Sequence, residues 1–147
     1  MINGRFSLIA AVALVFRDGD KVLLLRRFNT GYMDGHYSLP SGHIDGNETA
    51  KQGAIREARE EVGADIKPHD LELLHTMHRK ASDHERIDLF FVAKRWAGKL
   101  ENMEPDRCDE LKWVKIKSLP IKMAPEVRAG LQKIEAGEIY SDFNFPQ

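Results

Sequence analysis

The chain has 147 residues, of which 42% are hydrophobic and 31% are charged, and its formal net charge at pH 7 is −1. This composition is ordinary for a soluble globular protein, and the length suits one domain with its own core, so we expect a single domain over residues 1–147. The near-neutral charge gives no electrostatic attraction to nucleic acids or membranes, and we predict neither as a partner. Cys108 is the single cysteine, which excludes an internal disulfide and fits a reducing compartment.

The N-terminal segment carries an apolar run after Arg5 that could be mistaken for a secretory signal. The run is too short to span a bilayer. A DG turn at residues 18–19 separates it from a second apolar run, and this arrangement predicts a β-hairpin. We expect strands at residues 8–16 and 22–25, buried on both faces because they are almost continuously apolar. We therefore expect the protein to be cytoplasmic.

Residues 28–37 (FNTGYMDGHY) are rich in Gly, Asn, Asp and aromatic residues and predict a loop. The loop lies just before the glutamate-bearing segment described next, at a place that suits a ligand-binding loop. Ordinary loop packing is the alternative for each of its aromatic residues Phe28, Tyr32 and Tyr37.

Residues 49–63 predict an α-helix. Thr49 and Gln52 have the spacing of a capping box, Asn47 is a second N-cap candidate, and Gly63 supplies a helix stop. Gly53 lies in the middle of this helix, where a glycine costs roughly 1 kcal/mol relative to alanine. We therefore expect another backbone segment to approach closely at Gly53.

Three glutamates, Glu57, Glu60 and Glu61, stand at i, i+3 and i+4 and so project from one face of this helix. The apolar residues fall on a different arc that can pack on a core: Ala54, Ile55, Ala58 and Val62. Clustered carboxylates repel one another, and such oxygen-rich clusters are typical of sites for a hard divalent cation such as Mg2+. The alternative is a solvated helix with i,i+4 ion pairs such as Arg56–Glu60.

The second half of the chain predicts strands at residues 71–78 and 87–96, joined by an exposed polar link at 79–86. An acidic loop at 101–110 and a short strand at 111–116 follow. Residues 125–136 predict a closing helix, because Pro125 suits a first turn and an apolar stripe follows. We expect the aromatic tail, residues 140–147, to pack on the body or on a partner.

Strands on both sides of one central helix, with a second helix at the end, predict an α/β fold whose sheet is covered on both faces. His75 and His78 stand three apart on a predicted strand and therefore point to opposite faces, so they do not form a second metal site. No motif surrounds Cys108, and we assign it no nucleophilic role.

The stretch 42–64, GHIDGNETAKQGAIREAREEVGA, resembles the Nudix box. Seven fixed residues match that pattern at fixed spacing: Gly42, Glu48, Arg56, Glu57, Glu60, Glu61 and Gly63. The lead-in at 37–40 is similar to the family's aromatic-x-x-Pro, while Ser41 replaces a common glycine, and Ala58 and Ala64 replace larger aliphatics. The resemblance implies the Nudix fold, an α/β/α sandwich with a mixed central sheet.

The reaction that the resemblance implies is hydrolysis of a nucleoside diphosphate linked to another group, with Mg2+, or Mn2+ in its place, as cofactor. It implies Glu57, Glu60 and Glu61 as metal ligands, together with the backbone carbonyl of Ser41. Glu57, or a carboxylate outside the box, would be the general base. Arg56 would orient Glu60 or a neighbouring carboxylate. Glu48 is expected to be structural or a water-mediated ligand.

We predict substrate contacts from Gly42, which lets the backbone come close to phosphate, and from His43, Tyr37 and Glu104. For His43 a plain loop role is the alternative. The resemblance places an additional carboxylate in the acidic loop, where the candidates are Glu104, Asp106, Asp109 and Glu110. Glu85 and Asp88 are less favoured alternatives.

The substrate class rests on two further signals. Residues 76–82 (TMHRKAS) lack the proline or tyrosine that the family uses for ADP-ribose or dinucleoside polyphosphates. Residues 102–105, with Cys108 and Trp113, resemble loops of MutT-like nucleoside triphosphate pyrophosphohydrolases. We therefore favour a small-molecule nucleotide, a nucleoside triphosphate cleaved to the monophosphate and pyrophosphate.

Two alternatives for the function remain open. In the first alternative, the enzyme hydrolyses another nucleoside diphosphate derivative, such as ADP-ribose, a nucleotide sugar or a dinucleoside polyphosphate. A non-catalytic nucleotide-binding module is the alternative from another class, although such modules usually lose a box glutamate and this chain keeps all of them. The apolar strands and aromatic tail also suggest a homodimer, a common state in related proteins.

Overall fold

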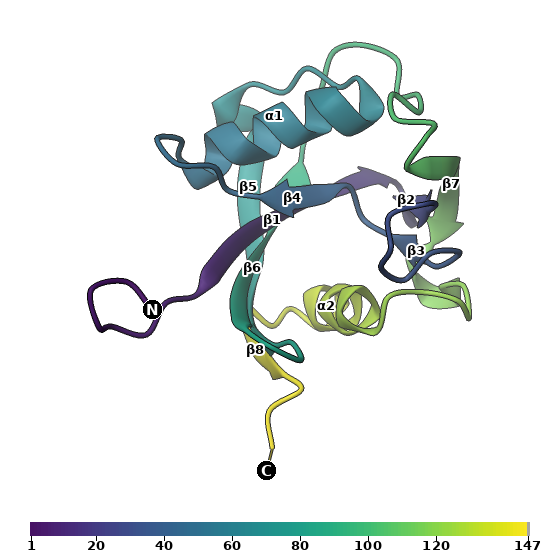
Figure 1. Cartoon of the computed structure of the whole chain (residues 1–147). Helices are drawn as coiled ribbons and strands as arrows, with labels where there is room; N and C mark the ends of the chain where they lie inside the picture. Colours follow the sequence, from purple (N-terminus) through teal and green to yellow (C-terminus); the bar gives the residue numbers. More distant parts are fainter. Residues whose placement is uncertain (147) are drawn as a thin grey trace.

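The computed structural model describes residues 1–146 and has three layers, with a mixed sheet between two helices (Figure 1). Helix α1 (Ala50–Val62) packs on one face of the sheet, and helix α2 (Pro125–Glu135) packs on the other. This arrangement confirms the expected α/β/α sandwich. Gln147, the last residue of the predicted tail, lies outside the described residues.

The sheet has eight strands, and its main order is β3-β2-β1-β6-β5-β8, with β4 paired to β1 and β7 paired to β2. Two pairings, β1 with β6 and β5 with β8, are parallel, and the others are antiparallel. The strands are β1 (Ile9–Asp18), β2 (Lys21–Arg27), β3 (Tyr37–Ser38), β4 (Ser41–His43), β5 (Leu71–Lys80), β6 (Glu85–Ala93), β7 (Cys108–Lys115) and β8 (Tyr140–Phe143).

Strands β1 and β2 form the β-hairpin that the DG turn at residues 18–19 predicts. Asp18 pairs with Lys21, and Gly19 supplies the left-handed φ of +61° at the first position of the two-residue loop. Strand β1 is buried from Ala11 to Phe16 because it serves two cores, one on each face of the sheet. Its successive side chains point to opposite faces, so Val15 joins the core under α2 while Leu14 and Phe16 join the core under α1.

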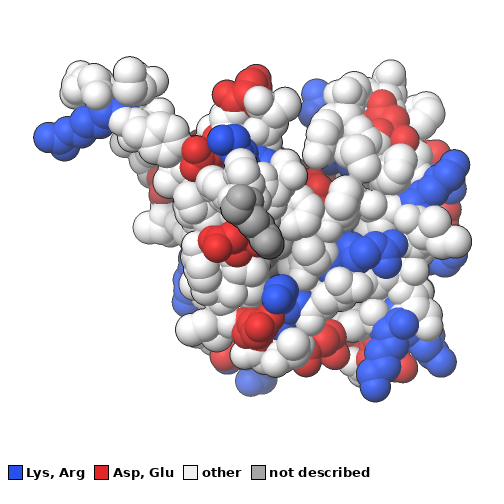
Figure 2. All heavy atoms as spheres, turned by 90° about the horizontal axis from the view of Figure 1, so that it is seen from below, with Lys and Arg blue, Asp and Glu red and all other residues white. Residues whose placement is uncertain are grey.

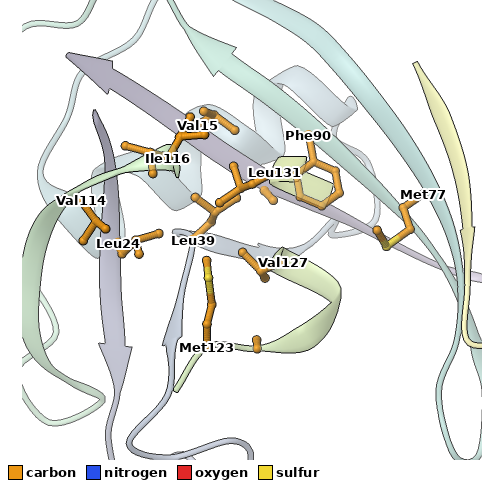
Figure 3. Close-up of a cluster of buried hydrophobic side chains, with 13 residues drawn as sticks. Val15, Leu24, Leu39, Met77, Phe90, Val114, Ile116, Met123, Val127 and Leu131 are labelled. Carbon is orange, nitrogen blue, oxygen red and sulfur yellow. The ribbon is translucent and has the colours of Figure 1, made fainter. Parts of the chain in front are cut away.

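The core under α2 is shown in Figure 3, where Val127 and Leu131 of the helix meet Val15, Leu24 and Phe90 of the sheet. The core under α1 is built from smaller helical side chains, Ala54, Ala58 and Val62, against Val12, Leu14, Phe16, Leu23 and Phe91. Small residues on α1 let the helix lie close to the sheet. The acidic face of α1 is thereby held against the loop that precedes it.

Helix α1 begins and ends where the sequence predicts. Thr49 is the N-cap, both bonds of the capping box with Gln52 are present, and Gly63 is the left-handed C-cap with φ of +72°. The expectation that a backbone segment approaches Gly53 was wrong. The atom nearest to a Cβ placed there would be Oε1 of the Glu48 side chain, at 3.0 Å, rather than a backbone segment.

Several predicted bounds shift in the structure. Strand β6 ends at Ala93, and Trp96 instead packs edge-on against Phe16 with ring centroids 5.1 Å apart. Strand β7 begins at Cys108, within the predicted acidic loop. The link expected to be exposed at 79–86 shrinks to a short turn because β5 and β6 are longer, and the side chains of Arg79 and Arg86 are only 12% and 18% exposed.

The C-terminal tail packs on the body of the protein through β8, which adds to the sheet beside β5. The fully buried His75 fixes this strand, because its Nδ1 lies 2.7 Å from the carbonyl oxygen of Glu138 and its Nε2 lies 2.7 Å from Oγ of Ser141. His78 faces the other way and contacts Glu85 and Phe145. The two histidines therefore lie apart, as predicted.

The surface carries interspersed acidic and basic side chains with no broad region of one sign on the face in Figure 2. The N-terminal segment stands out from the body in both overall views. Among residues 1–146 there is no helix with the length and apolarity needed to cross a membrane.

Candidate active site

A cleft of about 500 Å³ opens between the acidic face of α1 and the edge of α2. It brings together residues from β1, β4, the loop after β2, α1, β5, β6, the loop before β7 and the start of α2. The polar side chains that line it are Arg27, Thr30, Tyr32, Ser38, Ser41, His43, Glu57, Glu60, Glu61, Arg79, Arg86, Asp88, Glu104, Arg107 and Glu126. Glu57, Glu60 and Glu61, which the sequence places on one face of the helix, all line this cleft.

Arg56 is the centre of the acidic face of α1. Its guanidinium bonds both carboxylate oxygens of Glu48, at 3.1 and 2.8 Å, and its Nη2 also donates to the carbonyl of His43 at 3.0 Å. Its Nη1 donates to Oε1 of Glu57 at 2.7 Å and lies 3.4 Å from Oε2 of Glu60. Arg56 therefore ties the loop before α1 to two of the predicted metal ligands, and its main partners are Glu48 and Glu57 rather than Glu60.

Glu48 is held by hydrogen bonds from two other groups. Besides the paired bonds from Arg56, it accepts a bond of 2.7 Å from the backbone N–H of Asp45. These bonds hold the pKa of Glu48 at about 2, with the Arg56 hydrogen bond as the main cause. An ionised Glu48 keeps Arg56 in place, and it does not line the cleft.

Gly42 makes room for Glu57. A Cβ at position 42 would lie 2.1 Å from Oε1 of Glu57. We expected this glycine to let phosphate approach the backbone, but in the structure the nearby space is filled by the Glu57 carboxylate. The glycine therefore positions a predicted metal ligand.

Glu61 is the most enclosed of the three glutamates. The backbone N–H of Ser41 donates to its Oε2 at 3.0 Å. Burial raises the pKa of Glu61 well above its usual value, and the neighbouring carboxylates of Glu57 and Glu104 raise it further. Burial also raises the pKa of Glu57, against the opposing effect of Arg56. A positive charge in the cleft would offset the effect of burial on both carboxylates.

Strand β4 turns the carbonyl of Ser41 away from β1. Leu14 bonds the carbonyl of Pro40 and Ile44 bonds the carbonyl of Ala10, so Ser41, lying between, belongs to a non-hydrogen-bonded pair of this antiparallel ladder. Its N–H goes to Glu61 instead. The Ser41 carbonyl is thus free of the ladder, in a residue that is bonded to Glu61 and lines the cleft.

The acidic loop contributes one of its four candidates. Glu104 lines the cleft and is close enough to Glu61 to raise its pKa. Asp109 and Glu110 instead pair with Arg26, at 2.7 and 3.2 Å, and neither lines the cleft. Asp106 does not line it either. Glu104 is therefore the loop carboxylate that the structure brings to the site.

Tyr37 lies outside the cleft, so the structure does not place it as a substrate contact. Its ring faces Arg26 and Lys112, whose charged ends lie 5.9 and 5.8 Å from the ring centroid. The aromatic residue that does line the cleft is Tyr32, from the loop at 28–36. Its hydroxyl donates to Oε1 of Glu126 at 3.3 Å.

The far wall of the cleft is charged, and sequence reasoning largely missed it. Arg79 donates from Nε to Oδ2 of Asp88 at 2.7 Å, and Arg86 donates from Nε to Oδ1 of the same carboxylate at 3.3 Å. Asp88 is one of the less favoured alternatives for the carboxylate outside the box. Arg79 could have been found by extending the period of two in β5 from Met77, since that places both side chains on the same face.

His43 lines the cleft between these two walls. Its Nε2 lies 3.3 Å from Nη1 of Arg86. Burial and the neighbouring Arg86 lower the pKa of His43, so the ring is neutral near pH 7 and can accept the hydrogen bond from Arg86. His43 therefore positions a cation that faces the cleft.

The residues present fit a hard divalent cation in kind. Glu57, Glu60, Glu61, Glu104 and the Ser41 carbonyl offer oxygen alone, which is the donor set that Mg2+ prefers. In residues 1–146 no three His, Cys, Asp or Glu side chains stand close enough together, as they are placed, to hold an ion. Arg56 keeps Glu57 and Glu60 in ion pairs, so a bound cation would compete with its guanidinium.

Comparison with known proteins supports the resemblance to the Nudix family. A family model for the NUDIX domain matches residues 7–134. The 8-oxo-dGTP diphosphatase of Escherichia coli K12 is 28% identical over 88 residues, which cover 60% of this chain and 67% of that protein. The uncharacterized Nudix hydrolase YvcI of Bacillus subtilis is 30% identical over 115 residues, covering 76% of this chain and 69% of that protein.

Solved structures show the same fold. A MutT NUDIX hydrolase from Burkholderia pseudomallei superposes with a TM-score of 0.78 at 23% identity, covering 86% of this chain and 97% of the other. The family model spans most of the chain, and four of the seven box residues line one cleft, Gly42, Glu57, Glu60 and Glu61. The chain belongs to the NUDIX domain family and is a pyrophosphohydrolase of that family.

Proposed function

We propose that this enzyme uses Mg2+ to hydrolyse a nucleoside triphosphate to the nucleoside monophosphate and pyrophosphate. The observation that carries the proposal is that one cleft joins the carboxylates of Glu57, Glu60, Glu61 and Glu104 to a second wall of polar and apolar side chains. The first set suits a cation and its phosphates, and the second suits a nucleoside. Similarity to a protein named as an 8-oxo-dGTP diphosphatase supports a nucleoside triphosphate as the substrate.

The glutamates would hold the ion, together with the carbonyl of Ser41. When bound, Mg2+ neutralises charge on the diphosphate oxygens and lowers the pKa of the attacking water. Glu57 would accept a proton from that water, because Arg56 holds its carboxylate in the cleft at 2.7 Å. Mn2+, which shares the preference for oxygen ligands, is expected to substitute.

Charged residues around the glutamates would support Glu57 and contact the phosphates. Two hydrogen bonds join Arg56 to Glu48, and a third from Arg56 holds Glu57. Arg27 and Arg107 line the cleft and can neutralise phosphate charge that the cation does not reach. Water adds to one phosphorus of the α,β-anhydride and gives a proton to Glu57, the bond from that phosphorus to the bridging oxygen breaks, and the monophosphate and pyrophosphate result.

The experiment is a panel of nucleoside triphosphates, nucleotide sugars, ADP-ribose and dinucleoside polyphosphates, each assayed with Mg2+ for released phosphate and pyrophosphate. We expect pyrophosphate from at least one triphosphate and little orthophosphate. A clear preference for ADP-ribose, a nucleotide sugar or a dinucleoside polyphosphate would overturn the triphosphate assignment while keeping the reaction class. Binding without turnover of any of these compounds would support a nucleotide-binding module instead.

A further inference from the structure

The loop at residues 99–107 leads into β7 and passes the C-terminal end of α1 (Figure 1). The last carbonyls of a helix have no partner within the helix, and this loop donates to two of them. The backbone N–H of Glu101 donates to the carbonyl of Val62 at 3.1 Å. The N–H of Met103 donates to the carbonyl of Glu61, also at 3.1 Å. The loop is therefore attached to the turn of α1 that carries a predicted metal ligand.

The backbone of Glu104 is fixed on both sides within this loop. Its N–H donates to Oδ1 of Asn102 at 3.0 Å. Its carbonyl accepts hydrogen bonds of 2.9 Å from the N–H groups of both Arg107 and Cys108. The side chain of Glu104 lines the cleft and lies close enough to Glu61 to raise the pKa of that carboxyl group. The path of the loop therefore decides where the Glu104 carboxylate stands.

The side chain of Asn102 spans this loop. Its bond from the N–H two residues further on is an ordinary Asx turn. Its second bond is not local, because Nδ2 donates at 2.6 Å to the carbonyl of Cys108, where β7 begins. Both ends of the amide are thus occupied, and a carboxylate of the same shape could not make both bonds because it only accepts. Asn102 does not line the cleft itself, so it acts on the site through the loop.

The bridge made by Asn102 opposes a repulsion between carboxylates. Glu104 and Glu61 must both be ionised to bind a cation, and like charges placed close together repel each other. A loop at the surface could relieve that repulsion by moving away from the helix. The bond from Asn102 to Cys108 resists this movement, because it closes the loop on strand β7, which is itself paired with β2.

We propose that Asn102 is a positioning residue, which holds Glu104 beside Glu61 so that both carboxylates can bind one cation. This inference rests on the proposed function, since the two carboxylates would share the proposed Mg2+. Removing a hydrogen-bond partner that orients a metal ligand typically lowers metal affinity or activity by roughly 10- to 100-fold. The loss of the Asn102 side chain should fall in that range.

The test measures the dissociation constant of Mn2+ alone, by titration followed with electron paramagnetic resonance, on the full chain without nucleotide. Asn102→Ala and Glu104→Gln should each weaken Mn2+ binding by roughly 10- to 100-fold. The double variant should lose no more than Glu104→Gln alone, because the first residue acts through the second. Asp106→Ala is the matched control, since Asp106 is exposed in the same loop and does not line the cleft. Its dissociation constant should equal that of the wild type.

Turnover provides the same comparison by a second route. With Mg2+ and the nucleotide that the wild type hydrolyses best, kcat/KM should follow the same order among the variants. A loss in Asn102→Ala that stays undiminished in the Glu104→Gln background would show a purely structural role and would overturn the proposal. Wild-type Mn2+ affinity in Asn102→Ala would overturn it too, while leaving the proposed function intact. A wild type that binds no Mn2+ would instead overturn the proposed function, and this inference with it.

Hydrogen exchange of the wild type in EDTA keeps the proposal testable if Asn102→Ala does not fold. The amide of Glu104, which donates to Asn102, should exchange more slowly than the amide of Asp106. The Asp106 amide has no acceptor within residues 1–146, so it reports the unprotected rate for this loop. Slower exchange at Glu104 supports the bridge through Asn102, and equal rates would overturn it.

Discussion

The carboxylate of Glu57 occupies the space that a side chain at Gly42 would need, with only 2.1 Å between Oε1 and a Cβ placed at that position. A glycine of β4 and a glutamate of α1, fifteen residues apart in the sequence, are thus fitted to each other. Arg56 fixes the same carboxylate from the other side at 2.7 Å. The position of Glu57 is therefore determined by its neighbours before any ligand binds.

The substitution Gly42→Ala tests this fit. It should displace Glu57 and lower kcat/KM by roughly 10- to 100-fold, since a displacement of about 1 Å at a reacting group can cost 10²-fold. The melting temperature in EDTA should change little, because the added methyl group meets the end of a side chain rather than backbone. Gly46→Ala is the matched control in the turn that follows β4, where a Cβ would meet nothing within 4 Å. Equal activity in both variants would contradict the fit.

The guanidinium of Arg56 gives a second prediction. Arg56→Ala should lower the free energy of unfolding by about 1–3 kcal/mol, because it leaves Glu48 and Glu57 without their countercharge. Activity should fall as well, since Glu57 loses its support. Arg59→Ala is the control, because its bond to Asp65 lies on the surface, where ion pairs contribute about 0–1 kcal/mol. Denaturant melts that rank Arg59→Ala as the more damaging change would reject this role for Arg56.

The third prediction concerns pH. The folded protein raises the pKa of Glu61 well above 4.5, first through burial and then through Glu57 and Glu104. A raised folded-state pKa means that protonated Glu61 favours folding, so this stabilisation is present below about pH 4.5 and is lost as pH rises through the folded-state pKa. Mg2+ needs the ionised carboxylate, so its stabilising effect and the activity should both grow toward alkaline pH.

Thermal melts between about pH 4 and pH 9, with EDTA and with Mg2+, check this account. The difference between the two melting temperatures should widen with pH in the wild type and should be small and flat in Glu61→Gln. A difference that narrows as pH rises would contradict the pKa assignment.

The fourth prediction is a homodimer. The N-terminal segment exposes Ile2, Phe6 and Leu8 on a part of the chain that stands out from the body (Figure 1). A second copy of the chain would cover such apolar side chains and remove them from water. Light scattering at micromolar concentration should give twice the monomer mass of 16.8 kDa, and a mass equal to the monomer would remove the prediction.

Local signals predicted the fold and the acidic half of the cleft. The capping box at Thr49, the stop at Gly63 and the spacing of Glu57, Glu60 and Glu61 depend on residues near one another in sequence, so they can be read directly. Glu104 was a candidate among four acidic residues, and it could be separated from Asp109 only by seeing that Arg26 pairs with the latter.

The far wall could not be read in the same way. Arg79, Asp88 and Glu126 meet through pairing of β5 with β6 and packing of α2, which bring together residues 9 and more positions apart. Arg79 and Arg86 looked like parts of an exposed link because polar sequence is typical of loops. Tyr37 and Tyr32 were equivalent as loop aromatics in the sequence, and only the folded structure shows that Tyr32 lines the cleft and Tyr37 does not.

The central claim is that Glu57, Glu60 and Glu61 exist to hold a metal ion for catalysis. Turnover of the wild type should need Mg2+ or Mn2+ and should vanish in EDTA. Like charges three and four residues apart destabilise a helix by a few tenths of a kcal/mol per pair, so Glu60→Gln in EDTA should be as stable as the wild type or slightly more stable. Its rise in melting temperature with Mg2+ should shrink, because an ion that binds the folded state stabilises it by mass action.

The most direct measurement compares the turnover of Glu60→Gln with Mg2+ and its thermal melt in EDTA. Glu135→Gln is the control, because Glu135 of α2 pairs with Arg17 at 3.0 Å and does not line the cleft. We predict a loss of turnover of roughly 100-fold or more, the scale for removing one group that stabilises transition-state charge, with an unchanged or slightly raised melting temperature. Near-normal turnover together with a melting temperature well below that of the wild type would show that these carboxylates are structural and would contradict the assignment of the site.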